Sequence, residues 1–163
     1  MKPLLISLFA ISALAACGAG DPPVQEAEPP LYKYASIKTA MLEAQATLPV
    51  FWTHFEANAA GEEQFRVKIV EPSDAYARDY VWVEYLQQAD ETEWRGSVSI
   101  ENGGNDRFTT GQTLDFAEAD IVDWAYREDG RERGAYTTRA MLDLAPDADT
   151  SAIRATFHES PVP

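Results

Sequence analysis

Two carboxylic acids in this chain interrupt otherwise apolar stretches, and a carboxyl group in such a place is suited to acid–base chemistry. Glu84 lies in the aromatic and β-branched stretch YVWVEYL, and Asp123 directly precedes Trp124 in a second such stretch. Burial among apolar groups raises the pKa of a carboxyl group toward the range that a general acid needs. A hydrolase that uses Glu84 or Asp123 is therefore one hypothesis. The alternative is that both side chains point to solvent from an exposed strand face.

More side chains able to contact a ligand lie close to Asp123. Trp124 and Tyr126 follow it in the same predicted strand. Three further candidates come after the predicted hairpin: Tyr136, Thr137 and Arg139. Arg139 opens a predicted short helix, where it either pairs with Asp123 or receives an anionic ligand beside the free N–H groups of the helix. In a structural interpretation, Trp124 belongs to the core, Thr137 caps the helix, and Asp123 and Arg139 form an ion pair. We favour the structural interpretation.

Metal, nucleophile and phosphate chemistry lack their usual signatures in this sequence. A metal site needs several ligands, and the two histidines, His54 and His158, lie far apart in the chain. We interpret each histidine as packed within the fold or facing solvent. No serine has the G-x-S-x-G context of a hydrolase nucleophile, and Gly103 and Gly104 lack the lysine of a phosphate-binding loop. The sequence therefore predicts neither a metal nor another cofactor.

Cys17, the only cysteine, ends a segment typical of a bacterial signal peptide. A basic start at Lys2 precedes about 11 mostly apolar residues, fewer than the roughly 20 that span a bilayer. The segment closes with Leu-Ala-Ala-Cys, which resembles the lipobox of bacterial lipoproteins. That resemblance implies that the peptide before Cys17 is removed and that Cys17 carries acyl chains. Gly18 follows instead of the aspartate that holds lipoproteins at the inner membrane, which implies an outer-membrane protein facing the periplasm.

The predicted organisation has four parts. Residues 1–16 form the signal peptide, 17–31 the lipidated cysteine and a flexible tether, 32–146 a single domain, and 147–163 a C-terminal tail. The net formal charge is −14, and loss of Lys2 with the signal peptide makes the mature chain more acidic. Nucleic acid and anionic membrane surfaces repel such a chain. We therefore expect no nucleic-acid partner, membrane contact through the lipid anchor only, and a protein or a small molecule as ligand.

Apolar residues at helical spacing predict an N-terminal helix in the domain. The helix begins near Ile37, with Ser36 as its N-cap. Pro49 lacks an N–H group and restricts the residue before it, which predicts a break near Leu48. A second short helix then reaches Phe55.

A period of two follows the helix and predicts a sheet. Arg66 and Lys68 alternate with apolar residues over 65–69, as in a strand with one buried face. Further strands are predicted at 80–86, 94–101, 114–116 and 122–126. A short helix capped by Thr137 or Thr138 comes next. Together these elements predict an α+β fold, in which the N-terminal helix packs on a bent antiparallel sheet of about five strands and a short helix lies near the C-terminus.

Residues 111–142 resemble a known bacterial family. The stretch contains a glycine, I-x-D-W-x-Y, a turn and G-x-Y-T-x-R, in the order and spacing of the domain of unknown function family 2314. Shorter matches extend over most of the domain, and one of them ends at Asn102, a further candidate for ligand binding. The chain departs from the family at Gly104 and Gln112, which would change the shape or charge of a binding rim in this loop. The family implies a fold and domain limits but no reaction.

Three hypotheses for function follow. The first is a non-enzymatic, lipid-anchored protein that binds a protein or small ligand at the cell envelope. The second is an acidic inhibitor, similar to an immunity protein, that docks onto a cationic enzyme. The third is the hydrolase, which requires a concave pocket that holds a carboxyl group of raised pKa beside aromatic side chains.

Overall fold

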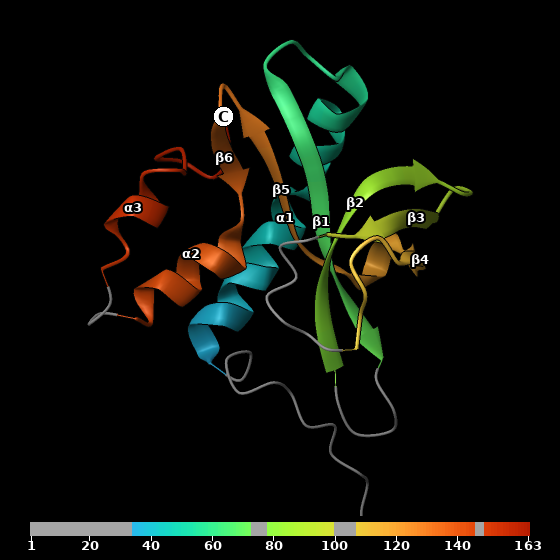
Figure 1. Ribbon diagram of the computed structural model, residues 1–163, viewed down its shortest axis with the longest axis horizontal. Helices are drawn as coiled ribbons and strands as arrows, with labels where there is room; N and C mark the ends of the chain where they lie inside the picture. The colour runs from blue at the N-terminus through green and yellow to red at the C-terminus, as the bar shows by residue number, and fades with distance from the viewer. Residues whose placement is uncertain (1–33, 73–77, 100–106, 146–148) are drawn as a thin grey trace, which may run out of the picture.

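The computed structural model describes residues 34–72, 78–99, 107–145 and 149–163 (Figure 1). Within them, one long helix is followed by six strands and two short helices. The elements are α1 (Ala35–Ala57), β1 (Glu62–Pro72), β2 (Arg78–Gln88), β3 (Glu93–Val98), β4 (Thr113–Ala117), the 3-10 turn η2 (Glu118–Asp120), β5 (Ile121–Glu128), β6 (Arg131–Gly134), α2 (Tyr136–Asp143) and α3 (Ser151–Arg154). The predicted α+β class is confirmed, with six strands instead of about five. None of the described helices combines the length and hydrophobicity needed to cross a bilayer.

All six strands form one antiparallel sheet in the order β4-β3-β2-β1-β5-β6. The long strands β1 and β2 lie at its centre. The β1–β5 ladder shifts register twice, between Glu63 and Arg66 and between Lys68 and Ile69. Such bulges bend a strand and increase its twist, and Figure 1 shows β2 curving away from β1 toward β3. The sheet is bent, as predicted.

Helix α1 covers one face of the sheet with a stripe of small and apolar residues. Ala44, Leu48 and Phe51 are buried there, and the indole N–H of Trp124 donates to the Ala44 carbonyl at 3.0 Å. Burial of one large apolar side chain contributes about 1.5–3 kcal/mol. This face therefore holds the main core, which also contains Val67, Ile69, Val81, Val83, Trp94, Val98, Phe116, Ile121 and Tyr126.

The long helix runs through Pro49 without interruption, so the predicted break near Leu48 is wrong. Pro49 lies on the exposed side of α1, where a carbonyl that loses its N–H partner can bond to water. Leu48 and Phe51 on either side of it are buried, and their burial outweighs the lost hydrogen bond. The predicted N-cap is also wrong. The cap position is Tyr34, no side chain caps the helix, and Ser36 lies inside the first turn.

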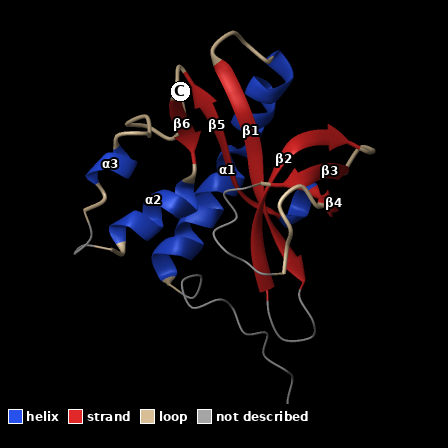
Figure 2. Cartoon of the chain, in the orientation of Figure 1, coloured by secondary structure: helices blue, strands red, loops and turns tan. Residues whose placement is uncertain are grey.

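Helix α2 lies beside α1 (Figure 2). Together with the C-terminal segment, residues 149–163, it also packs on the face of the sheet that α1 leaves open. Trp82 of β2 and Ala125 of β5 form a second apolar cluster there with Phe157. The backbone of Phe157 also forms a parallel bridge to Glu132 of β6. The folded unit thus includes residues that the sequence assigned to a tail, and β5 is buried on both faces.

Candidate functional site

Asp123 lies at the centre of the residues that the sequence singled out, and it is fully buried. Its Oδ1 accepts hydrogen bonds from the backbone N–H groups of Trp124 at 2.8 Å and Tyr136 at 3.1 Å. Its Oδ2 accepts from the N–H (2.8 Å) and the hydroxyl (2.6 Å) of Thr137. The first N–H groups of a helix have no partner within it. Asp123 therefore caps α2 from a neighbouring strand, and the prediction that Thr137 or Thr138 is the cap is wrong.

A buried lysine completes what we call the Asp123 network: Asp123, Thr137 and Lys68. Lys68 lies opposite Asp123 in the β1–β5 ladder, and its Nζ donates to the Thr137 hydroxyl at 2.7 Å. Nζ also lies 4.8 Å from the centre of the Trp82 ring, which is a cation–π distance. Burial lowers the pKa of Lys68 to about 8, and Asp123 opposes this shift. Burial raises the pKa of Asp123, while Lys68 and the hydrogen bonds to the carboxylate lower it.

Arg66 and Lys68 are both buried, so the prediction that this side of the strand faces away from the core is wrong. Arg66 pairs with Glu132 of β6 at 2.9 Å, and both side chains are nearly excluded from solvent. The Arg66 guanidinium also lies 5.3 Å from the centre of the Trp82 ring. An alternating pattern is typical of a strand with one exposed face, whereas α2 and the C-terminal segment cover that face here. Charged side chains are tolerated inside because they have partners.

Arg139 does not pair with Asp123, so the predicted ion pair is wrong. Its guanidinium donates instead to three backbone carbonyls: those of Gly134 (2.8 Å), His158 (3.0 Å) and Glu132 (3.2 Å). It also lies 4.7 Å from the centre of the Phe157 ring. Arg139 therefore ties α2 to β6 and to the C-terminal segment.

The aromatic residues that the sequence proposed as ligand contacts belong to the core. Trp124 is fully buried against α1. Tyr126 is fully buried too, its ring stacks on His54 with 5.2 Å between centroids, and burial raises its pKa to about 12. The hydroxyl of Tyr136 lies 2.9 Å from Oγ1 of Thr47 on α1. These side chains hold the helices against the sheet and leave little ring surface for a ligand.

Glu84 does not join the Asp123 network. It is partly exposed on β2, opposite Arg66 of β1. Strand β1 separates it from Asp123 on β5. The structure therefore gives the two acids separate surroundings. Asn102 and Cys17 lie outside the described residues.

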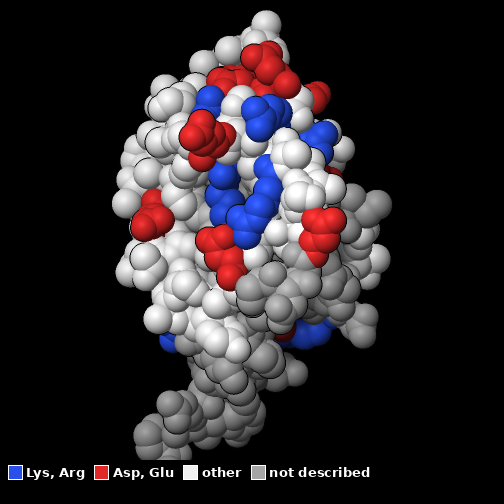
Figure 3. Space-filling model, turned by 90° about the vertical axis from the view of Figure 1, so that its left-hand side faces the viewer, with Lys and Arg blue, Asp and Glu red and all other residues white. Residues whose placement is uncertain are grey.

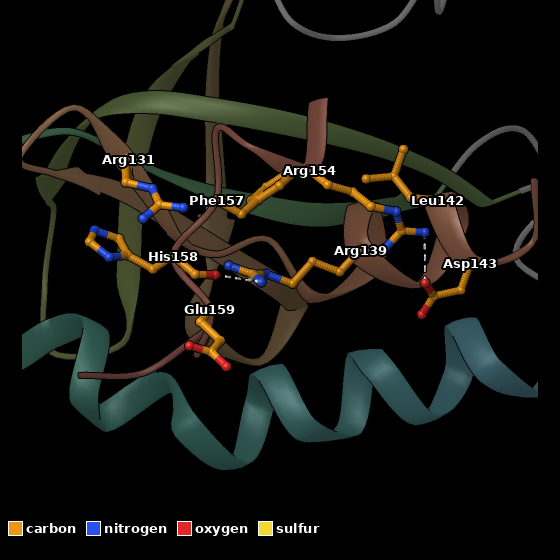
Figure 4. Close-up of a pocket in the computed structure, with 8 residues that line it drawn as sticks. All are labelled: Arg131, Arg139, Leu142, Asp143, Arg154, Phe157, His158 and Glu159. Carbon is orange, nitrogen blue, oxygen red and sulfur yellow. Dashed lines mark hydrogen bonds and ion pairs between the residues drawn. The ribbon is translucent and has the colours of Figure 1, made fainter. Parts of the chain in front are cut away.

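An open cavity of about 370 Å³ lies between α2, α3, β6 and the C-terminal segment (Figure 4). We call it the arginine pocket after three of the residues that line it: Arg131, Arg139, Leu142, Asp143, Arg154, Phe157, His158 and Glu159. Figure 3 shows basic side chains gathered in the middle of one face of the molecule, with acidic side chains around them. This local excess of positive charge contrasts with the net charge of −14 of the chain.

The three arginines of the pocket are held to different degrees. Arg139 is fixed by its three carbonyl acceptors. Arg154 pairs with Asp143 at 2.8 Å, but both side chains are largely exposed to solvent. Arg131 is exposed, and within the described part of the chain its guanidinium has no hydrogen bond or ion pair. In Figure 4 it extends toward Phe157, the most deeply buried residue of the pocket.

Among the residues of this pocket, sequence reasoning proposed only Arg139 as a ligand contact, and it interpreted His158 as packed within the fold or facing solvent. Arg131 follows the hairpin turn, and Arg154 lies in the segment assigned to a tail. More than half of the arginines of this acidic chain come after residue 126, a signal that could have indicated a basic surface. The contact between β6 and residues 149–163, which brings these arginines together, leaves no periodicity in the sequence.

The chemistry available differs between these places. Among the described residues, no group of three or more His, Cys, Asp or Glu side chains is arranged to hold a metal. The Asp123 network contains an acid, but the protein itself occupies both carboxylate oxygens. The arginine pocket presents positive charge and N–H donors to solvent, and guanidinium groups bind carboxylates and phosphates through paired donors. This arrangement favours the binding of an anion.

Residues 35–157 match the model of the domain of unknown function family 2314, described as an uncharacterised protein conserved in bacteria. The chain belongs to this family. The resemblance found in its motifs is thereby confirmed, and the matched region reaches Phe157 in the arginine pocket. No curated protein and no solved structure matched the chain.

Proposed function

We propose that this protein is a lipid-anchored component of the bacterial cell envelope that faces the periplasm and binds a ligand without catalysing a reaction. The observation that carries the binding role is the arginine pocket, an open and basic cavity on an acidic chain. Membership of a bacterial family supports the bacterial setting. Leu-Ala-Ala-Cys at residues 14–17 supports the anchor.

Binding is better supported than hydrolysis because Asp123, the acid of raised pKa, is inaccessible to a substrate. Asp123 has no exposed surface, and its oxygens accept four hydrogen bonds from the protein. A general acid must come within hydrogen-bond distance of its substrate. The Asp123 network would have to open before a substrate could reach this carboxyl group.

The anchor is tested by Cys17→Ser in bacteria that are fed a labelled fatty acid. The unchanged chain is expected to take up the label and to sediment with the outer membrane. Cys17→Ser is expected to lose the label and to leave that fraction, because acyl chains supply the attachment. Equal labelling of both chains would contradict the proposal.

The binding role is tested by capture from envelope extracts with the full-length chain as bait. Arg131→Glu reverses the charge in the arginine pocket. Arg95→Glu is the matched control, because Arg95 lies on β3, far from β6 in the sheet, in an exposed pair with Asp115. We expect a component that the unchanged chain and Arg95→Glu retain and that Arg131→Glu loses. If Arg131→Glu retains the same components as the control, the pocket is not the binding surface.

A further inference from the structure

We propose that the ligand group bound by the arginine pocket is a phosphate, carried either by a lipid headgroup or by a soluble phosphomonoester. This inference rests on the proposed function and names the chemical class of its ligand. Three features of the pocket carry it: the arrangement of the cations, their incomplete pairing and the apolar surface between them.

The cations approach the pocket from different elements. Arg131 comes from β6, Arg139 from α2 and Arg154 from α3. Figure 4 shows Arg131 and Arg154 at opposite ends of the pocket with Arg139 between them. A carboxylate has two oxygens in one plane, whereas a phosphate monoester carries three acceptor oxygens and close to two charges. Donors that reach one pocket from three different elements therefore suit the several oxygens of a phosphate better than the two coplanar oxygens of a carboxylate.

The positive charges of the pocket are only partly compensated. Arg131 has no partner in the described part of the chain, and the exposed pair of Arg154 with Asp143 is of a kind that contributes little. Arg139 uses three donors on carbonyls, and a guanidinium has five N–H groups. Donors and charge thus remain available to a ligand that enters.

An apolar surface separates the arginines. Phe157 and Leu142 belong to the second apolar cluster and also line the pocket. Apolar walls exclude water, and electrostatic attraction is stronger where water is excluded. They also offer a contact for the carbon atoms that carry the phosphate.

Asp143 and Glu159 compete with an anion for the same arginines. Asp143 holds Arg154 at 2.8 Å, and Glu159 lines the same pocket. The inference therefore predicts effects of opposite sign. Loss of an arginine weakens phosphate binding, whereas Asp143→Asn strengthens it because Arg154 is released and a repelling charge is removed.

The test uses the full-length chain with Cys17→Ser, which offers no thiol for acylation, in calorimetric titrations at constant ionic strength. The probes are inorganic phosphate, glycerol 3-phosphate, acetate, and vesicles of phosphatidylcholine with or without phosphatidic acid. We expect saturable phosphate binding that Arg131→Gln and Arg154→Gln each weaken about tenfold. Arg95→Gln should leave it unchanged, and Asp143→Asn should tighten it a few-fold. Binding of glycerol 3-phosphate but not of the vesicles would assign a soluble source, and the reverse would assign a lipid.

Three outcomes would overturn the inference: no saturable phosphate binding, equal binding by Arg131→Gln and Arg95→Gln, or acetate binding as tight as phosphate binding. These outcomes are separable from failure of the proposed function. If capture from envelope extracts depends on Arg131 while phosphate does not bind, only the ligand class is wrong. If phosphate binds through Arg131 while capture ignores that residue, the site stands and its role in the envelope is wrong.

Discussion

The Asp123 network and the arginine pocket both lie against helix α2, yet they use charge in opposite ways. In the network, an acid and a lysine are buried, and the protein supplies hydrogen bonds to both. In the pocket, arginines surround an open cavity, and Arg131 has no partner in the described part of the chain. The short run Gly134–Arg139 serves both, since Thr137 closes the network and Arg139 lines the pocket. Neighbouring polar residues of one motif can therefore divide between holding the fold and meeting a ligand.

This difference predicts that changes in the network reduce stability and that changes in the pocket reduce binding. Arg139 stands between the two, because it lines the pocket while its hydrogen bonds join α2 to β6 and the C-terminal segment. Substitutions can separate the two regions.

The largest effect is expected for Asp123→Ala. The change leaves N–H groups of the first turn of α2 unsatisfied in a buried place and removes the acid opposite Lys68. Breaking a buried charged network costs about 3–5 kcal/mol, and we expect the free energy of unfolding in urea to fall by that amount. Asp115→Ala is the control, because this acid pairs with Arg95 in an exposed place, where an ion pair contributes little to stability. Equal losses would show that Asp123 contributes no more than a surface acid.

The next effect is expected for Gly134→Ala, compared with Gly130→Ala. Both glycines have positive φ, 69° and 77°, so both substitutions strain the backbone. A Cβ at Gly134 would lie 2.2 Å from the Trp124 carbonyl oxygen and 2.5 Å from its ring, whereas nothing lies within 4 Å of one at Gly130. We expect Gly134→Ala to lose about 1–3 kcal/mol more than Gly130→Ala in urea unfolding. A Gly130→Ala loss of the same size would mean that strain alone governs both positions.

A smaller, pH-dependent effect is expected for Lys68→Met. The pKa of Lys68 is about 8 in the folded chain against 10.5 for an ordinary lysine. Between these values the folded chain binds fewer protons than the unfolded chain, so stability rises with pH across this window. Lys68→Met should remove a rise on the order of 1–3 kcal/mol. Urea unfolding at pH 7 and at pH 10.5 measures it, and a rise that is the same in both chains would contradict the burial of a titrating Lys68.

The sequence predicts the order of the helices and strands well. It does not predict which face of the sheet α2 and residues 149–163 cover. Alternation over Arg66 and Lys68 indicates a strand, and the structure contains it. The same alternation implies that one face of the strand is exposed. That implication is wrong because α2 and residues 149–163, which are distant in the chain, cover this face. Pro49 shows the same limit on a helix: local rules predict a break, and burial of Leu48 and Phe51 overrides it.

The candidate site divides in a similar way. The sequence left two alternatives open for both Glu84 and Asp123, a buried carboxyl group or one that points to solvent. In the structure Asp123 is buried and hydrogen-bonded, whereas Glu84 is partly exposed. Lys68, the partner of Asp123, was missed, because the pairing of β1 with β5 cannot be inferred from the sequence of either strand alone. Arg131 and Arg154 were missed because their meeting depends on how the C-terminal segment folds back on β6.

The smallest effect on stability is expected for Arg131→Gln. This variant also gives the clearest test of the difference between the Asp123 network and the arginine pocket. The side chain is exposed and has no partner within the described residues, so the free energy of unfolding should change by no more than about 0.5 kcal/mol.

Arg139→Gln is the informative contrast. It removes hydrogen bonds to three carbonyls and the contact with Phe157, so it should destabilise the chain by more than 1 kcal/mol, on the order expected for lost hydrogen bonds to a charged group. Both variants are expected to weaken phosphate binding, but only Arg131→Gln should do so at unchanged stability. If Arg131→Gln destabilised the fold as much as Arg139→Gln, the arginine pocket would be a second structural network, and its difference from the Asp123 network would disappear.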